Sequence, residues 1–161
     1  MSTRTTGVDA VLSWRNNNST SITLAYNYNN TEVLDQREVG GQLPVGEGTI
    51  FNLENNLPKS RANLTINQGF GNFSAMIRAN YYGSTIDERG TREEVGAETL
   101  VDIELSLQAS EELRFILGAN NVLDNYPDMI DTRVSQGMPF PRRTPIGYHG
   151  GMVYFKAVYK L

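Results

Sequence analysis

The residues best able to do chemistry in this 161-residue chain are carboxylates, arginines and a single histidine. Asp102 and Glu104 lie two positions apart on an expected strand, so they share a face on which paired carboxylates could act as acid and base. Pairing with Arg78 or Arg114 on neighbouring strands is the simpler interpretation. His149 has no partners at a spacing that suggests a catalytic triad. The sequence shows no catalytic constellation, and we expect a protein that is not an enzyme.

Loop residues offer two further kinds of site. Asp124, Asp128 and Asp131 could supply oxygen ligands to a cation, but they lack the glycine and glutamate spacing of an EF-hand. Arg142 and Arg143 could contact lipopolysaccharide phosphates or an anionic ligand. With no cysteine and one histidine, thiolate and histidine-rich metal sites are not expected. We therefore expect no cofactor and no bound metal.

The elements that must position these residues are segments in which apolar and polar side chains alternate, the pattern of β-strands. Short turns and long glycine- and proline-containing connections alternate between them. The expected strands are 5–15, 19–31, 61–67, 73–82, 101–108, 113–120 and 152–161; the long connections are about 32–51, 84–96 and 124–145. This predicts an all-β fold, an antiparallel up-and-down meander of about seven strands.

Composition excludes some classes of protein. The net charge is −4, so nothing favours a nucleic-acid partner. No apolar run is long enough for a membrane-spanning helix, and mean hydropathy is −0.39. Alternation alone fits a sheet with one face in water or a barrel wall around a lumen. Strict alternation of short and long connections favours an outer-membrane barrel, as do Trp14, Phe70 and Phe73 beside short turns and Tyr81 beside a long loop.

Residues 113–127, which read LRFILGANNVLDNYP, resemble the penultimate strand of TonB-dependent outer-membrane receptors. Residues 145–161 are similar to the final strand of that family, although the chain ends on Leu161 where the family usually has an aromatic residue. Residues 6–9 and 58–64 are similar to earlier strand starts. The resemblance implies that residues 1–161 are the C-terminal part of a roughly 22-stranded transmembrane β-barrel, without the plug domain and the earlier strands.

For the intact receptor, the resemblance implies energy-coupled uptake of a scarce solute, such as a ferric siderophore, cobalamin or oligosaccharide, across the bacterial outer membrane. The implied partners are outer-membrane lipid and lipopolysaccharide, TonB through the missing plug, and the small solute itself. Because binding residues concentrate on loops above a rigid scaffold, we expect the ligand to contact loop side chains. The candidates are Tyr82, Asp87, Arg89, Arg92, Tyr126, Arg133, Arg142 and Arg143.

Two alternatives remain open from the sequence. The chain could be a complete eight-stranded outer-membrane barrel that serves as an anchor or adhesin, with residues 48–56 as the additional strand. It could also be a secreted β-sandwich that binds glycans. The start of the chain lacks a signal-peptide pattern, so either the outer-membrane interpretation is wrong or the chain is a piece of a longer exported protein.

Overall fold

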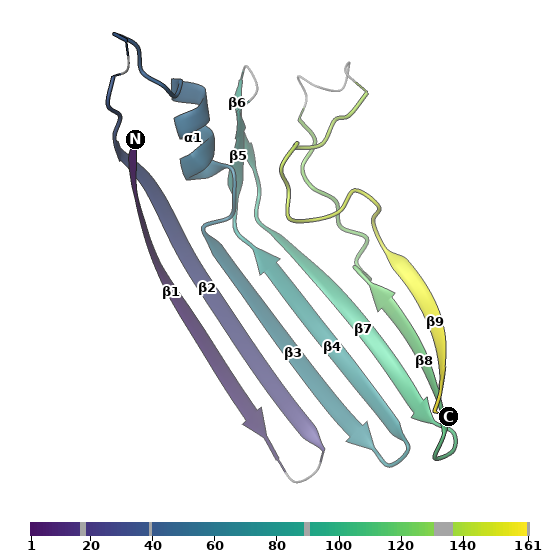
Figure 1. Cartoon of the computed structure of the whole chain (residues 1–161). Coiled ribbons are helices and arrows are strands. Elements are labelled where there is room, and N and C mark those ends of the chain that lie inside the picture. The colour runs from purple at the N-terminus through teal and green to yellow at the C-terminus, as the bar shows by residue number, and fades with distance from the viewer. Residues whose placement is uncertain (17–18, 39, 89–90, 131–136, 161) are drawn as a thin grey trace.

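The computed structural model describes residues 1–16, 19–38, 40–88, 91–130 and 137–160. Seven strands form one antiparallel sheet in which most neighbours in space are also neighbours in sequence (Figure 1). In sheet order they are β1 (Ser2–Arg15), β2 (Thr20–Asp35), β3 (Ser60–Phe70), β4 (Phe73–Tyr82), β7 (Glu98–Gln108), β8 (Leu113–Asn120) and β9 (Met152–Tyr159). The predicted all-β meander of seven strands is confirmed.

Three shorter elements lie at the end of the sheet where the long connections emerge (Figure 1). They are the helix α1 (Glu47–Asn55) and the hairpin formed by β5 (Thr85–Glu88) and β6 (Arg92–Val95). The suggestion that residues 48–56 form an additional strand is wrong, because residues 48–55 belong to α1 and Asn56 caps its end. The sequence also did not predict the β5–β6 hairpin within residues 84–96. Asn17 and Asn18 of the first predicted turn and Leu161 lie outside the described residues.

The register places apolar residues of neighbouring strands directly opposite one another. Ile22, Ile66, Ile77 and Ile103 form one continuous row across β2, β3, β4 and β7. Because side chains on a strand alternate between faces, Arg78 beside Ile77 points to the opposite face. Each strand therefore contributes to one apolar and one polar face, as the alternation predicted.

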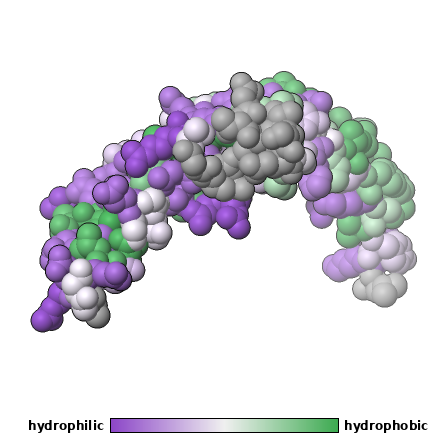
Figure 2. All heavy atoms as spheres, turned by 90° about the horizontal axis from the view of Figure 1, so that it is seen from above, coloured by the Kyte–Doolittle hydropathy of each residue, from purple (hydrophilic) through white to green (hydrophobic). Residues whose placement is uncertain are grey.

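The sheet is curved into an open arc (Figure 2). Hydrophobic residues gather on the convex side at the β8–β9 end, and hydrophilic residues gather on the concave side near the middle. Convex side chains are open to the surroundings: Leu12 is 69% exposed, Ile77 49% and Phe155 66%. The buried hydrophobic residues among those described are Val95, Ile116, Ile130 and Ile146, none of which belongs to the convex face.

This arrangement distinguishes part of a larger barrel from the two alternatives, a β-sandwich and a closed eight-stranded barrel. A β-sandwich would cover the apolar face with a second sheet, but in the described part of the chain the other sheet is only the β5–β6 hairpin at the loop end. A closed eight-stranded barrel would pair its first and last strands, whereas β1 and β9 are the two edges of this sheet. Of the helices in the described ranges, none has the length and apolar character to cross a membrane.

Candidate functional site

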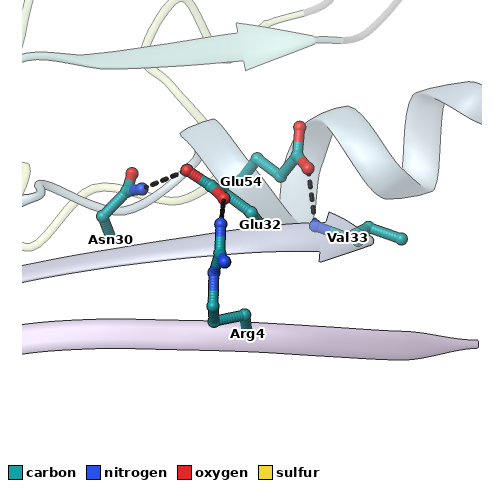
Figure 3. A network of polar contacts seen from close by, with 5 residues as sticks. All are labelled: Arg4, Asn30, Glu32, Val33 and Glu54. Atoms are coloured by element: carbon teal, nitrogen blue, oxygen red, sulfur yellow. Dashed lines mark hydrogen bonds and ion pairs between the residues drawn. The ribbon is translucent and has the colours of Figure 1, made fainter. Parts of the chain in front are cut away.

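The helix α1 is fastened to the top of β2. The backbone N–H of Val33 donates to Glu54 Oε1 at 2.8 Å (Figure 3). Next to this bond, Arg4 on β1 donates to Glu32 at 2.8 Å, and Asn30 donates to the other carboxylate oxygen of Glu32 at 3.1 Å. The bond to Glu54 fixes the end of α1 with respect to the sheet, and the bonds to Glu32 join β1 to β2 beside it.

The electrostatics of this corner follow from the ion pair. Glu32 lies near the loop end of β2, after the polar residues Asn29, Asn30 and Thr31, and its register partner on β1 is Arg4. The hydrogen bond and charge of Arg4 lower the pKa of Glu32. Both side chains are about half exposed, so the pair is a positional link and contributes little stability.

A second set of contacts joins α1 to the β5–β6 hairpin through Glu88. Asn52 on the helix donates to Glu88 Oε2 at 3.3 Å, and Arg92 lies 3.7 Å from Glu88 Oε1. The Arg92 guanidinium also lies 3.9 Å above the centre of the Phe51 ring, within the range of a cation–π interaction. Two connections that are separate in sequence therefore form one unit.

The connection between β8 and β9 completes the cluster. The backbone N–H of Arg142 donates to Asp87 Oδ2 at 2.9 Å. A cavity of about 120 Å³ lies where the three connections meet; it is lined by Asn52, Asn56, Ile86, Asp87, Glu88, Arg142 and Arg143. Of the residues selected from the sequence, Asp87, Arg142 and Arg143 thus come together, with Arg92 one contact away.

Two of the other candidates lie apart from this cavity. Tyr126 stacks on Phe140, which stacks on Tyr148. A hydrogen bond to Asp124, together with the negative charge of that residue, raises the pKa of Tyr126. Tyr82 lies at the end of β4 beside a cavity of about 290 Å³ on the concave side, which Arg61 also lines. Arg89 and Arg133 lie outside the described residues.

The aspartates suggested as cation ligands support the backbone. Asp124 accepts from the Gly151 N–H and Asp128 from the Gly96 N–H, each at 2.7 Å. Asp131 lies outside the described residues, and among those described no group of three or more His, Cys, Asp or Glu side chains could hold a metal ion. His149 is an exposed loop residue.

The receptor-like segment after β8 also forms a corner. Asn121 is 8% exposed and has a positive φ of 48°. Its side chain donates to the Asn125 carbonyl at 2.8 Å and accepts from the Asn125 N–H at 3.1 Å. The asparagine-rich motif therefore shapes the exit of the chain from β8 and lies outside the cavity.

The predicted ion pairs of Asp102 and Glu104 are wrong, because uncharged donors contact these carboxylates. Arg78 is the register partner of Asp102, but its Nε donates to Thr65 at 3.4 Å. Asp102 instead accepts from Asn80 at 3.3 Å and from the Asn121 N–H at 2.9 Å. Glu104 accepts from the Tyr154 hydroxyl at 2.8 Å. Arg114 pairs in register with Gln108. The concave face is thus a hydrogen-bonded polar wall.

The sequence signals for the cluster were weak. In α1, Ile50 and Leu53 are three residues apart, and Leu57 follows just after the helix; this helical spacing is too short to stand out. β5 and β6 have four residues each, so their alternation is equally brief. Asn52, Asn56 and Glu88 were missed for this reason, since only the folded chain brings them to the cavity.

Comparison with known proteins finds no matching family model and no matching curated protein. Solved structures do match. The siderophore receptor PiuA from Acinetobacter baumannii aligns with a TM-score of 0.67 and 15% identity, over 97% of this chain and 22% of the PiuA chain. A chain of the FpvAI–pyocin S2 complex aligns with a TM-score of 0.58 and 16% identity, over 78% of this chain and 16% of that one. This chain therefore spans about a fifth of those structures and has the fold of part of a TonB-dependent siderophore-receptor barrel.

Proposed function

We propose that the chain is part of an outer-membrane receptor that takes up a scarce solute, of the ferric siderophore class, by TonB-dependent, energy-coupled transport. The observation that carries the proposal is the division of one curved sheet into an uncovered apolar convex face and a hydrogen-bonded polar concave face. In a membrane barrel the apolar convex face would contact lipid hydrocarbon, and the polar concave face would line the lumen. The similarity of fold to PiuA, which is a siderophore receptor, supports the solute class.

In this proposal each part of the chain has a task. The strands line the passage and face outer-membrane lipid and lipopolysaccharide. The loop cluster, with Asp87, Arg92, Arg142 and Arg143, contacts the solute outside the cell, and Tyr82 contacts it lower on the concave wall. TonB acts on a plug supplied by the rest of the receptor. The chain performs no catalytic step.

Placement in the membrane is tested at two adjacent positions of β7. Leu105 is 53% exposed on the convex face, and Ser106 points to the concave face. The chain contains no cysteine, so Leu105→Cys and Ser106→Cys each introduce one site for a nitroxide label. In outer membranes carrying the gene product, we expect the label at 105 to be accessible to oxygen and the label at 106 to a polar nickel reagent. Equal access of the nickel reagent to both would contradict a lipid-facing convex surface.

Transport is tested by deleting the gene and measuring uptake of radioactive iron from a panel of ferric siderophores under iron limitation. We expect the loss of uptake of at least one complex, restored by the intact gene. Normal uptake of every tested complex by the deletion strain would refute the proposal that the solute is a ferric siderophore.

A further inference from the structure

Arg142 and Arg143 lie at the cavity between α1, β5 and the β8–β9 connection, where no described side chain contacts their charged groups. Within the part of the chain that the structure describes, neither the Arg142 nor the Arg143 guanidinium has a hydrogen-bond or ion-pair partner. The hydrogen bond that the described residues make with Arg142 uses its backbone N–H. Both side chains are exposed and both line the cavity.

The carboxylates of the same cavity have partners already. Glu88 accepts from Asn52 and contacts Arg92, and Asp87 accepts from the Arg142 N–H. The lining of the cavity thus holds two guanidiniums, Arg142 and Arg143, and two carboxylates, Asp87 and Glu88. The ion pair with Arg92 offsets the charge of Glu88 from outside the cavity. The Asn56 side chain, also on the cavity wall, has no hydrogen-bond partner among the described residues and can donate to a ligand.

The size of the cavity restricts what enters. Its volume is about 120 Å³, and a water molecule occupies about 30 Å³ in the liquid. One small group fits, whereas an entire chelate does not. Guanidinium groups bind carboxylate and phosphate oxygens through paired, charge-assisted hydrogen bonds. The lining thus matches one oxygen-rich anionic group.

The cavity lined by Arg142 and Arg143 lies on the same side of the sheet as the proposed passage. Leu53 and Glu54 of α1 line a neighbouring cavity of about 200 Å³ together with Asn27 and Arg61, which belong to the concave face. Hence α1 leans over the concave side, and the residues next to it face the mouth of the passage. An anionic group held by Arg142, Arg143 and Asn56 would contact two of the three connections.

We propose that Arg142 and Arg143, with Asn56, form a binding site for an oxyanion group, and that this group is carried by the transported solute. The proposal rests on the proposed function for the source of the anion, but the site itself does not depend on transport. A lipopolysaccharide phosphate offers the same chemistry and is the alternative source.

The site is tested with the detergent-solubilised gene product, with inorganic phosphate and citrate as probes in calorimetric titrations. The variant is Arg142→Gln/Arg143→Gln. The matched control, Arg15→Gln/Arg37→Gln, removes two charges from exposed positions away from the cavity. We expect the first variant to bind both probes at least about tenfold more weakly, because it loses charge-assisted hydrogen bonds, and the control to bind as the wild type does. Wild-type affinity in the Arg142/Arg143 variant, or no binding of either probe to the wild type, overturns the proposal.

A second readout does not depend on variants. Phenylglyoxal modifies arginine, and peptide mass spectrometry follows each site. Phosphate and citrate should slow modification of Arg142 and Arg143 and leave Arg37 unchanged. Equal rates with and without the anions count against the site.

Further arms identify the source of the anion and separate the two proposals. Stronger protection by phosphorylated lipopolysaccharide than by citrate, lost with dephosphorylated lipopolysaccharide, assigns the site to lipid. If the gene is dispensable for ferric siderophore uptake while the arginines bind phosphate, the transport proposal fails and the site stands. If uptake requires the gene but the Arg142/Arg143 variant binds both probes normally, the site fails alone.

Discussion

Replacement of Ile77 by arginine tests whether the convex face contacts hydrocarbon. Ile77 lies on β4 with Phe73 and Tyr81 four residues away on either side. All three point to the convex face and are exposed, Ile77 by 49%. Aromatic residues mark the two interfaces of membrane barrels, so Ile77 is expected at the midplane.

The dimensions agree with this placement. From Phe73 to Tyr81 is eight residues, or about 27 Å along a strand at roughly 3.4 Å each. With the roughly 40° tilt of barrel strands this becomes about 21 Å across the membrane, close to the apolar band of about 25 Å. Arginine on the lipid face at the midplane costs about 2–4 kcal/mol, so Ile77→Arg should lower the free energy of unfolding by that amount.

Met76 supplies the matched control because it is the neighbouring residue and points to the concave side, where it lines a cavity with Asp102 and Glu104. Met76→Arg places the same charge near two carboxylates and should change stability by less than about 1 kcal/mol, as surface charges usually do. Denaturant titration of the gene product in phospholipid vesicles measures both values. Equal losses in the two variants, or a stable Ile77→Arg protein, would refute the assignment of the faces.

Three further predictions concern the β8–β9 region. Asn121→Ala should cost about 1–3 kcal/mol in the same titration, because it removes two hydrogen bonds of a buried side chain; an unchanged midpoint contradicts this. Asp124→Asn should lower the pKa of Tyr126, because Asp124 raises it; the absorbance of the phenolate measures the change. In the wild type, the bond between the two side chains stabilises the folded chain at pH values below the pKa of Tyr126 in the unfolded chain. This stabilisation is lost as the pH rises through the higher pKa of Tyr126 in the folded chain. Gly118→Ala should destabilise by about 1–3 kcal/mol, since a Cβ would meet the Tyr154 ring. Adding Tyr154→Gly should recover part of that loss, and strictly additive effects would disprove the contact.

Strand order and the assignment of faces could be predicted from the sequence because both depend on local alternation. A one-residue error would move Ile66 or Ile77 into the polar face, so the pattern itself defines the register. The partners of Asp102 and Glu104 could not be predicted in this way. Register places Arg78 opposite Asp102, yet the side chain reaches Thr65 instead. Asparagine and tyrosine donors on nearby strands satisfy the carboxylates without a charge.

The candidate site depended on contacts that no local pattern encodes. Asp87 and the Arg142 backbone are 55 residues apart in sequence, and Asn52 and Glu88 are 36 apart. Local signals for α1 and for the β5–β6 hairpin were weak, and these same elements build the cavity wall. Weak local specification is expected where function competes with regular structure. The alternating residues of the strands define the register of the sheet. Side chains in the three connections can therefore change without altering the strands. The proposed ligand contacts therefore rest on Arg142, Arg143 and their surroundings, and the proposed place in the membrane rests on the convex rows.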